Sequence, residues 1–511
     1  MKIKYYLRFF IVSFVLFAAP SSVMAMPGGL YMGNELRADV GPGLCSPAHV
    51  GDPISVYNGN NTQTQQDLVL PTPHHRGLFF ERSYNSRSHE MGPLGYGWTH
   101  TYEVCLEPSY TFARRAYLRI IDETGRGVYF EQAGDGYYAG AFKEKSTVKL
   151  EDGHYVWHRL DGSRFVFDKR HLLIRIDDGV GNRQYLTYDE GNRLAAVADS
   201  ATNYVLDFHY NSQRRLHYIS GQGGGGLPNL VWVIYDYDEN QNLVSVTYPD
   251  ASGFNYVYAD PNDVHNLTEK RNKTGRFLSS WSYDNQDRAI KNVTHDGKGV
   301  SIEYVDEHEV TVTDAEGVTR IYRIWDIGGR KVVTHIDAAP GHQRSPDEIR
   351  GISWDRKRRI IEVRRVGGLV TQYDDFDSRG NAQTVKYLKE TQIQRIVKYV
   401  YHPKIDAKLS ETELTEDSEP KRVIVWDYDE DGNETPNENP MGKPTRRIEW
   451  GLHEDDTGNM VPYEQITRFT YDEYGRLMSV DPFGSSDSDP EILRYDYFTF
   501  DILSGELSTG I

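Results

Sequence analysis

A tyrosine and an aspartate, followed by a tight turn and an Arg-Leu pair, recur along this chain. The clearest copy lies within 469–484 and consists of Tyr471, Asp472, Gly475, Arg476 and Leu477. More divergent copies consist of Tyr188, Asp189, Gly191, Arg193 and Leu194, of Tyr237 and Asp238, of Tyr283 and Asp284, and of Tyr428 and Asp429. Each copy is typical of a strand, a turn and a second strand. A chain that repeats one hairpin is expected to build an extended surface, which favours scaffolding and binding over a catalytic pocket.

The spacing of the repeat tyrosines predicts how these hairpins stack. Steps of 22, 27, 21, 25 and 21 residues separate the first six, which are Tyr188, Tyr210, Tyr237, Tyr258, Tyr283 and Tyr304. Hairpins stacked side by side satisfy each other's backbone edges and bury a continuous apolar face. The 36 tyrosines and 46 glycines fit this arrangement, because tyrosine suits strands and glycine supplies the positive φ of tight turns. The sequence therefore predicts an all-β fold in which repeated hairpins form a curved or spiralling sheet.

Residues 1–25 are typical of a secretory signal peptide. Lys2, Lys4 and Arg8 give a basic start, an apolar run follows, and Ala25 ends a stretch of small residues. The apolar run is about a dozen residues long, whereas a membrane-spanning helix needs about 20. The protein is therefore expected to be exported to the periplasm, cell surface or medium, with no integral membrane span. Residues 26–50, rich in glycine, proline and small polar residues, are predicted to form a leader arm.

The charge of the chain excludes two classes of partner. The net charge of −18 falls to −21 once the three basic residues of 1–25 are removed. Nucleic acid and anionic membranes are both bound through lysine and arginine. Such an acidic chain is expected to bind neither, and its charge favours solubility.

Two cysteines, Cys45 and Cys105, make up the whole cysteine content. In an oxidising compartment they are expected to form a single disulfide. That bond would close a loop of about 60 residues, which the loop-entropy model values at roughly 4 kcal/mol. Their spacing differs from the C-x-x-C pattern of zinc and redox sites, and the sequence predicts no metal site and no cofactor.

Residues 51–110, called the N-terminal block below, contain three motifs in a fixed order. The motifs are Gly51, Asp52, Pro53, Gly59 and Asn60, then Arg82, Tyr84, Asn85 and Ser86, and then Gly95, Gly97, Trp98, His100 and Tyr102. Together they resemble the domain that precedes the repeats in Rhs and related YD-repeat proteins. Residues 111–170 resemble the irregular hairpins at the entry to such a repeat array, and 171–511 are assigned to the array itself.

This resemblance implies both a shape and an outcome for the C-terminus. YD-repeat proteins spiral their hairpin sheet into a hollow shell, so a partial shell or barrel is expected here. Large Rhs proteins often carry a core that cuts itself at an Asp-Pro motif, with a variable toxin beyond it. Asp481–Gly484 matches the centre of that motif, but Arg476 and Ser485 stand where the motif has proline and leucine. The chain is therefore interpreted as a form without the self-cleaving core and the toxin.

Two pairs of aspartates are the candidates for catalysis. Asp236 and Asp238, and likewise Asp427 and Asp429, are two apart and would point to one face of a strand. A carboxylate pair could form a glycosidase dyad or a calcium site. Aspartate beside the repeat tyrosine also caps hairpin turns with its side chain, and this is the preferred interpretation.

Three functional hypotheses follow, in order of preference. The first is a non-enzymatic, exported scaffold that acts as a shell, carrier or cell-surface contact protein, linked to toxin delivery and bound to a protein cargo or a cell-surface protein. The second is a carbohydrate-binding, adhesin-like protein whose exposed aromatic rings stack on glycans. The third is a hydrolase that uses paired aspartates with shifted pKa values in a cleft.

Overall fold

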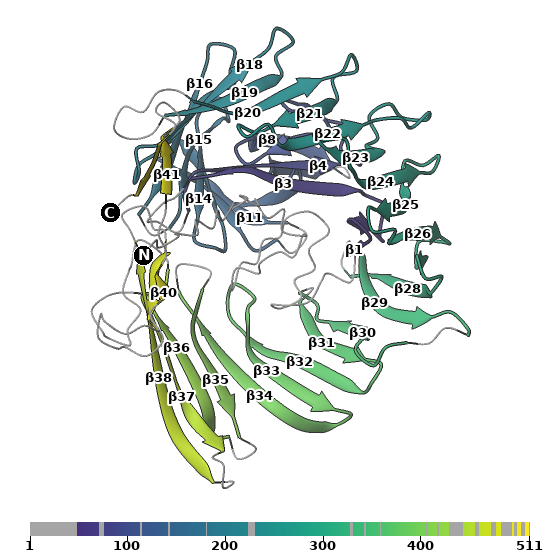
Figure 1. The fold of residues 1–511 in the computed structure, drawn as a ribbon, viewed down its shortest axis with the longest axis vertical. Helices are drawn as coiled ribbons and strands as arrows, with labels where there is room; N and C mark the ends of the chain where they lie inside the picture. The colour runs from purple at the N-terminus through teal and green to yellow at the C-terminus, as the bar shows by residue number, and fades with distance from the viewer. Residues whose placement is uncertain are drawn as a thin grey trace, which may run out of the picture.

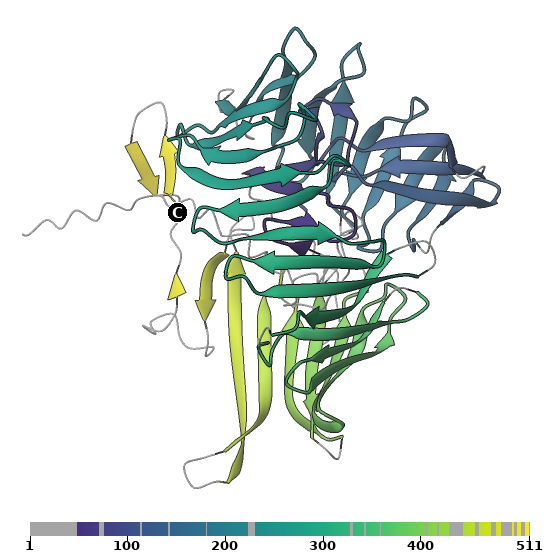
Figure 2. The ribbon, with the colours of Figure 1, turned by 90° about the vertical axis from the view of Figure 1, so that its right-hand side faces the viewer.

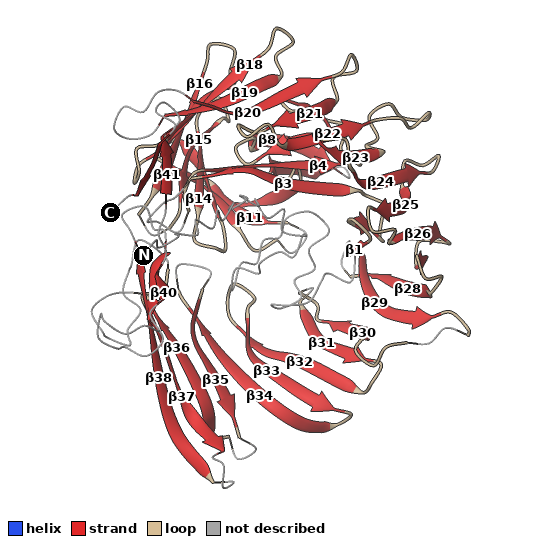
Figure 3. Ribbon diagram, in the orientation of Figure 1, coloured by secondary structure: helices blue, strands red, loops and turns tan. Residues whose placement is uncertain are grey.

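The computed structural model describes residues 49–70, 76–112, 115–141, 144–179, 181–222, 230–327, 331–341, 344–357, 359–403, 407–415, 418–428, 443–454, 459–471, 477–481, 493–494, 498–501 and 506–509. Across these ranges all regular structure is β-strand (Figure 3). The predicted all-β fold, with repeated hairpins in a curved sheet, is confirmed. No described segment forms a helix of the length and apolarity needed to cross a membrane. The predicted signal peptide, the leader arm before 49 and Cys45 lie outside the described residues.

The N-terminal block is built from short strands around one three-stranded sheet. In that sheet the central strand β4 pairs with β3 on one side and β7 on the other. The strands of the block before β8 (Cys105–Phe112) are β2 (Ile54–Ser55), β3 (Thr62–Val69), β4 (Phe79–Asn85), β5 (Met91–Gly92), β6 (Gly95–Tyr96) and β7 (Trp98–His100), and β1 (His49–Val50), just before the block, pairs with β2. The register places Arg82 opposite His100 and Tyr84 opposite Trp98. The second and third sequence motifs therefore lie on neighbouring strands.

From β8 onward a single antiparallel sheet follows the chain, and its strand order closes on itself. Cys105 in β8 also forms an antiparallel bridge with Leu172, just before β15. The first eight strands of this sheet thus make a ring. They are β8 (Cys105–Phe112), β9 (Arg115–Ile121), β10 (Gly127–Gly134), β11 (Tyr137–Gly140), β12 (Thr147–Glu151), β13 (His154–His158), β14 (Arg164–Phe167) and β15 (Leu173–Asp177).

The repeat array continues this sheet, each strand pairing with the next along the chain. Its first half comprises β16 (Arg183–Tyr188), β17 (Leu194–Asp199), β18 (Val205–Tyr210), β19 (Leu216–Gln222), β20 (Leu230–Tyr237), β21 (Leu243–Thr247), β22 (Gly253–Val257), β23 (Glu269–Asn272), β24 (Phe277–Tyr283), β25 (Ala289–Thr294), β26 (Gly299–Tyr304), β27 (Glu309–Asp314), β28 (Thr319–Asp326) and β29 (Lys331–Ala338). Its second half comprises β30 (Ile349–Trp354), β31 (Ile360–Arg365), β32 (Leu369–Phe376), β33 (Ala382–Lys389), β34 (Gln392–Tyr401), β35 (Lys408–Leu414), β36 (Pro420–Asp427), β37 (Arg446–Glu454), β38 (Met460–Tyr471), β39 (Leu477–Asp481) and β40 (Leu493–Arg494). A separate hairpin pairs β41 (Phe498–Asp501) with β42 (Glu506–Thr509).

The array curves around the N-terminal block. Figure 1 shows β3 and β4 crossing the upper half of the molecule, inside the arc of strands from β14 to β25, while β28 to β38 form the lower half. In the side view the strands in the middle of the array lie one above another, and the last long strands run in a different direction (Figure 2). This change of direction is the accumulated twist expected of a wide antiparallel sheet.

Several hairpin turns of the array, among them 189–193, 211–215 and 284–288, share one backbone conformation. In the turn 189–193, the Asp189 N–H donates to the Arg193 carbonyl at 2.9 Å and the Asn192 N–H donates to the Asp189 carbonyl at 3.0 Å. Asn192 has a φ of 57°, in the left-handed region. This is a type I turn followed by a left-handed residue and a bulge. Glycine is therefore not what supplies the positive φ here, because Gly191 precedes that position.

Candidate functional site

A buried ion pair lies where the N-terminal block meets the array. Arg82 in β4 donates from Nε to Asp67 Oδ2 at 2.7 Å, and both side chains are 0% exposed. Asp67 occupies a bulge of β3, where the register with β4 shifts between Gln66 and Leu68. A bulge re-aims a side chain, and here it accompanies an inward-facing carboxylate. The sequence analysis identified Arg82 but not Asp67.

Tyrosines of the array add hydrogen bonds to this ion pair, although Arg82 Nη2 is buried without a hydrogen-bond partner in the described part of the chain. The hydroxyls of Tyr235 and Tyr248 donate to Asp67 Oδ2 and Oδ1, at 2.9 and 2.7 Å. Arg82 Nη1 donates to the Tyr256 hydroxyl at 2.7 Å. The block and the hairpins of β20 to β22 are therefore joined through a single charged cluster.

Aromatic rings enclose the guanidinium of this cluster. The Arg82 Cζ lies 4.9 Å from the Trp98 ring centroid and 5.2 Å from that of Tyr256, an arrangement favourable for cation–π attraction. Burial alone would lower the pKa of Arg82, but the Asp67 carboxylate and the nearby tyrosines outweigh it and raise the pKa well above its ordinary value. For Tyr235 burial acts in the opposite direction, and together with the Asp67 carboxylate it raises the pKa of the hydroxyl well above its ordinary value. Arg82 and Tyr235 therefore keep their protons near neutral pH. The cluster holds the block against the array and is not arranged to transfer a proton.

A buried lysine lies beside the same cluster. Lys270 Nζ is 4.6 Å from the Phe254 ring centroid. Burial, followed by repulsion from Arg82, lowers the pKa of Lys270 to about 8. The lysine therefore keeps most of its charge at pH 7, held against an aromatic face.

Trp98 and His100 pack into the array from β7. Trp98 Nε1 donates to the Tyr258 hydroxyl at 2.9 Å. The His100 ring lies 4.9 Å from the ring of Phe80, and burial lowers the pKa of His100 to about 3. Its Nε2 is buried and has no hydrogen-bond partner among the described residues. His100 is therefore neutral and packs between the sheets. Its Nε2 faces no described group with which it could exchange a proton.

The first and second motifs also make their contacts with the array. The Trp281 indole donates to the Asp52 carbonyl at 2.7 Å. The Tyr84 hydroxyl donates to the His265 carbonyl and accepts from the Leu267 N–H, both at 3.0 Å. Two glycines mark close approaches: a Cβ at Gly59 would lie 2.3 Å from the Cβ of Arg288, and one at Gly95 would lie 2.4 Å from the Gln241 carbonyl oxygen.

The remaining motif residues shape the block itself. The Ser86 hydroxyl accepts from the Asn61 N–H at 2.9 Å and donates to Asn60 Oδ1 at 3.2 Å. The Asn85 side chain accepts from the Arg87 N–H at 3.0 Å. Others in the block are Gly51 and Pro53 in the turn before β2, Gly97 against the Tyr84 ring, and the buried Tyr102. These contacts fix the loops that present the block to the array.

The repeat tyrosines form a ladder of bonds from each repeat to the one before it. The Tyr210 hydroxyl donates to the Leu194 carbonyl at 2.9 Å, and the Tyr237 hydroxyl donates to the Leu216 carbonyl at 2.6 Å. Nine such bonds, between 2.6 and 3.3 Å, occur among the described residues: Tyr188 to Leu173, Tyr210 to Leu194, Tyr237 to Leu216, Tyr258 to Leu243, Tyr283 to Leu267, Tyr304 to Ala289, Tyr401 to Ala382, Tyr428 to Lys408 and Tyr471 to Pro444. In most of these bonds the tyrosine hydroxyl of one repeat donates to the backbone carbonyl of the motif leucine in the preceding repeat.

The repeat aspartates cap the turns. Asp189 Oδ1 accepts from the Gly191 and Arg193 N–H groups, both at 2.9 Å, and its Oδ2 accepts from Arg193 Nε at 2.7 Å. Asp284 makes the corresponding bonds with its own turn, and Asp238 accepts from the Asn242 N–H at 2.8 Å. The motif residues Asp429, Asp472, Gly475 and Arg476 lie outside the described residues, and Leu477 begins β39.

The candidate aspartate pairs have separate partners. Asp236 accepts from the Ser245 hydroxyl at 3.0 Å, while Asp238 is occupied by its turn. Asp427 forms an ion pair with Arg446 at 2.7 Å. No group of three or more metal-ligating side chains was found in the described part of the chain. Cys105 has no disulfide partner there, and since Cys45 is outside it, the predicted disulfide stays a prediction.

Comparison with known proteins gives matches over parts of the chain. Residues 51–130 match a family model described as "Domain of unknown function (DUF6531)". The "Probable deoxyribonuclease RhsA" of Dickeya dadantii (strain 3937) is 26% identical over 255 residues, which cover 49% of this chain and 17% of that protein. The "Probable deoxyribonuclease RhsB" of the same organism is 24% identical over 339 residues, covering 65% and 22%. The chain thus spans less than a quarter of the length of these relatives, and its sequence is Rhs-like over the matched part.

Matches to solved structures include two with TM-scores below 0.5. The "Crystal Structure of TcdB2-TccC3-TEV" matches with a TM-score of 0.41 at 10% identity, covering 92% of this chain and 28% of that one. The "Structure of Photorhabdus luminescens Tc holotoxin pore, Mutation TccC3-D651A" matches with a TM-score of 0.30 at 13% identity, covering 78% and 20%.

Proposed function

We propose that this chain is an exported, non-enzymatic scaffold associated with a toxin, and that its curved sheet forms a wall that holds or presents another polypeptide. The observation that carries the proposal is the set of contacts by which the N-terminal block is joined to the array. Charged and aromatic residues of the block are used to join it to the array, as where Tyr235 and Tyr248 donate to the Asp67 carboxylate that is paired with Arg82. The Rhs-like sequence of the matched part supports a link to toxins.

The physical basis of the proposal is the shape that the block imposes. A wide twisted sheet can curl to many radii, and contacts from Trp281 to Asp52 and from Tyr84 to Leu267 fix one of them. A wall of fixed curvature offers a partner one preformed surface. Preorganisation of this kind lowers the entropy cost of binding.

A crosslinking pull-down tests the carrier role. The tagged protein, residues 26–511, is recovered from the envelope and medium of its own host. We expect one polypeptide in stoichiometric amount, protected from added protease. The matched control is Gly59→Val, whose side chain would collide with the backbone of Arg288 and separate the block from the array. Absence of a partner, or equal recovery with the control, would contradict the proposal.

The proposed export is tested independently of any partner. N-terminal sequencing of the protein purified from its host is expected to begin at Met26, after removal of residues 1–25. A chain that begins at Met1 in the cytoplasmic fraction would contradict export without bearing on the scaffold.

A second candidate, glycan binding, is favoured by one exposed aromatic side chain. Trp325 in β28 is 61% exposed, and its ring lies 5.9 Å from that of His308. An exposed indole beside polar groups can stack on a sugar ring. We expect Trp325→Ala to lose binding on an array of host cell-wall and capsule glycans, and Tyr185→Ala, at another exposed ring, to retain it. Equal binding by both variants would remove this candidate.

A further inference from the structure

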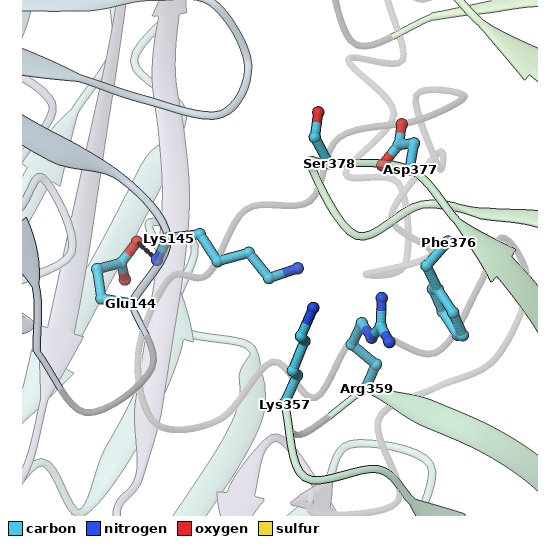
Figure 4. A pocket seen from close by; sticks show the side chains of 7 residues that line it. All are labelled: Glu144, Lys145, Lys357, Arg359, Phe376, Asp377 and Ser378. Carbon is cyan, nitrogen blue, oxygen red and sulfur yellow. Dashed lines mark hydrogen bonds between the residues drawn. The ribbon is translucent and has the colours of Figure 1, made fainter.

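A cavity of about 450 Å³ lies between the first ring and the second half of the array. One side is formed by Lys145, in the connection from β11 to β12. The other side is formed by Lys357 and Arg359, in the turn from β30 to β31, and by Asp377, just after β32. Figure 4 shows the Lys145 and Lys357 side chains extending from opposite sides toward the same space, with Arg359 beside them.

Most of the charges around this cavity are already paired. Glu144 forms an ion pair with Arg126 at 3.1 Å. Arg359 forms an ion pair with Asp355 at 2.6 Å, and its Cζ lies 4.0 Å from the centroid of the Phe376 ring.

Asp377 is engaged on its own side of the cavity. It lies 3.7 Å from Arg379 and accepts the N–H groups of Gly380 and Asn381 at 2.7 and 2.8 Å. The carboxylates of the cavity wall are therefore held by other groups.

Lys145 and Lys357 differ from the other charged residues of the cavity in having no ion-pair partner among the described residues. Lys145 Nζ donates to the Arg379 carbonyl at 3.3 Å. In the described part of the chain, neither Lys145 nor Lys357 has a carboxylate within ion-pair distance. Burial, and then the positive charge of Arg359, lower the pKa of Lys145, and the carboxylates of Asp377 and Asp355 offset this only in part. Two ammonium groups that face one partly enclosed space repel each other, and the repulsion is stronger there than in bulk water.

We propose that this cavity binds a tetrahedral oxyanion of the phosphate or sulfate type, held between Lys145 and Lys357 with Arg359 at its side. A dianion matches the two unpaired positive charges and turns their repulsion into attraction, through charge-assisted hydrogen bonds. Because the lysines come from segments more than 200 residues apart, the bound anion ties the first ring to the second half of the array.

Calorimetric titration of the full protein with inorganic phosphate tests the site. Sodium chloride at the same ionic strength serves as the blank. We expect saturable binding of phosphate, weakened at least tenfold in Lys357→Gln and in Lys145→Gln, and unchanged in Lys169→Gln, which removes an exposed lysine from the turn before β15. Inorganic sulfate and glucose 6-phosphate, as further titrants, distinguish a site for free ions from one that accepts a phosphate ester. No heat beyond the chloride blank, or equal affinity in all variants, would overturn the proposal.

Hydrogen exchange supplies a second readout that does not depend on the affinity itself. Phosphate is expected to slow amide exchange both in 144–151 and in 359–376 of the wild-type protein, and in neither segment of Lys357→Gln. Lys357 is exposed on a turn, so this variant is expected to keep its fold, which far-UV circular dichroism verifies. Protection that is absent, or that is confined to one of the two segments, contradicts a bridging anion.

Discussion

Asp67 and Arg82 carry opposite charges at a place where neither side chain reaches solvent. Moving such a pair out of water costs several kcal/mol per ion, which the mutual attraction offsets only when further hydrogen bonds satisfy both groups. The hydroxyls of Tyr235, Tyr248 and Tyr256 provide most of those bonds, and only Arg82 Nη2 is left buried without a partner among the described residues. Both charges belong to the block, but most of the hydrogen bonds that stabilise them come from the array, so the pair is stable only while the two parts are together.

Removing one member of this pair is expected to be severe. Arg82→Ala leaves the Asp67 carboxylate buried without its counter-charge, and we expect a loss of about 3–5 kcal/mol in the free energy of unfolding. Urea denaturation followed by tryptophan fluorescence measures it. Lys298→Ala, which breaks an ion pair exposed on a hairpin turn, is the control and should leave the midpoint unchanged. A similar small change in both variants would show that the buried pair does not join the two parts.

A second buried carboxyl predicts how stability depends on pH. Burial raises the pKa of Glu103 to about 8, with smaller opposing effects of Thr99 and Arg215. Glu103 as a whole residue is partly exposed, but its Oε2 atom is buried and has no hydrogen-bond partner in the described part of the chain. The pKa of Glu103 is therefore set by the buried surroundings of its carboxylate and not by the exposure of the rest of the residue. Since the ordinary value is 4.5, the unfolded chain releases this proton first, and stability is lost as the pH rises from about 4.5 to about 8.

Glu103→Gln should remove this loss. We expect the variant to match the wild type near pH 4.5 and to be more stable at pH 8, with a difference that grows by up to about 1.4 kcal/mol per pH unit. Thermal unfolding at a series of pH values checks it. Glu316→Gln, at an exposed turn, should show no such divergence. Parallel pH profiles for all three proteins would mean that Glu103 is ionised in the folded state.

The residues of this site differ in how far the sequence could identify them. Arg82, Tyr84 and Trp98 stand out because their motifs resemble those of a family. Asp67 does not, because nothing in the stretch of Gln65, Gln66 and Asp67 indicates a bulge that turns one carboxylate inward. Lys145 was missed for a different reason, since its significance arises from a turn more than 200 residues away.

At the scale of the hairpin, tyrosine and aspartate have separate tasks. The tyrosine hydroxyl reaches back to the preceding repeat, as from Tyr210 to Leu194, while the aspartate organises the turn that follows it. Asn211 and Asn272 occupy the aspartate position in other turns and accept the same backbone N–H groups. The turn requires a short side chain with an oxygen that accepts these N–H groups. The negative charge of aspartate contributes only a further contact with an arginine of the same turn.

Substitutions at Asp284 separate these two contributions. Asp284→Ala leaves the N–H groups of Gln286 and Arg288 without their acceptor, and we expect a loss of about 1–2 kcal/mol in the free energy of unfolding. Asp284→Asn keeps the acceptor and loses only the Arg288 contact, so it should cost less than about 0.5 kcal/mol. Chemical denaturation of the two variants measures the difference. Equal losses would assign the effect to charge and not to turn capping.

Prediction from sequence works well for these elements because period and turn chemistry are local. The spacing of the repeat tyrosines gave the correct order of hairpins, and the Asp-rich turns are local signals. The left-handed residue was harder to place, since in the turn of Asp189 it is Asn192 and not the neighbouring glycine. The acceptor of each tyrosine could not be predicted, because it depends on the lateral register between repeats.

At the scale of the whole molecule, the core is not uniform. One continuous cluster of buried side chains extends from Ile54 to Val363, so it includes the block, the first ring and the array as far as β31. A separate small cluster follows around Ala407 and Tyr428. All-β fold class follows from sequence alone, but this division does not, since it depends on how far the block reaches along the inner face of the sheet.

This division predicts two levels of stability. Repeat arrays approximate a sum of local and nearest-neighbour terms, and segments with fewer buried apolar contacts open more easily. We expect amides in β34 to β38 to exchange at least about tenfold faster than those in β16 to β25. Hydrogen exchange followed by mass spectrometry gives both rates in one experiment. Uniform protection would mean that the sheet unfolds as a single cooperative unit.

The bonds from each tyrosine to the preceding repeat have a consequence for how such a gene can change. Every donor is matched to a carbonyl one repeat earlier, as Tyr237 is to Leu216 and Tyr258 to Leu243. Duplication or excision of one whole repeat, within the array and away from the block, leaves each remaining donor opposite an acceptor. Recombination inside the gene can therefore lengthen or shorten the sheet in units of one hairpin without a new bonding rule, and the extent of the sheet becomes a heritable variable.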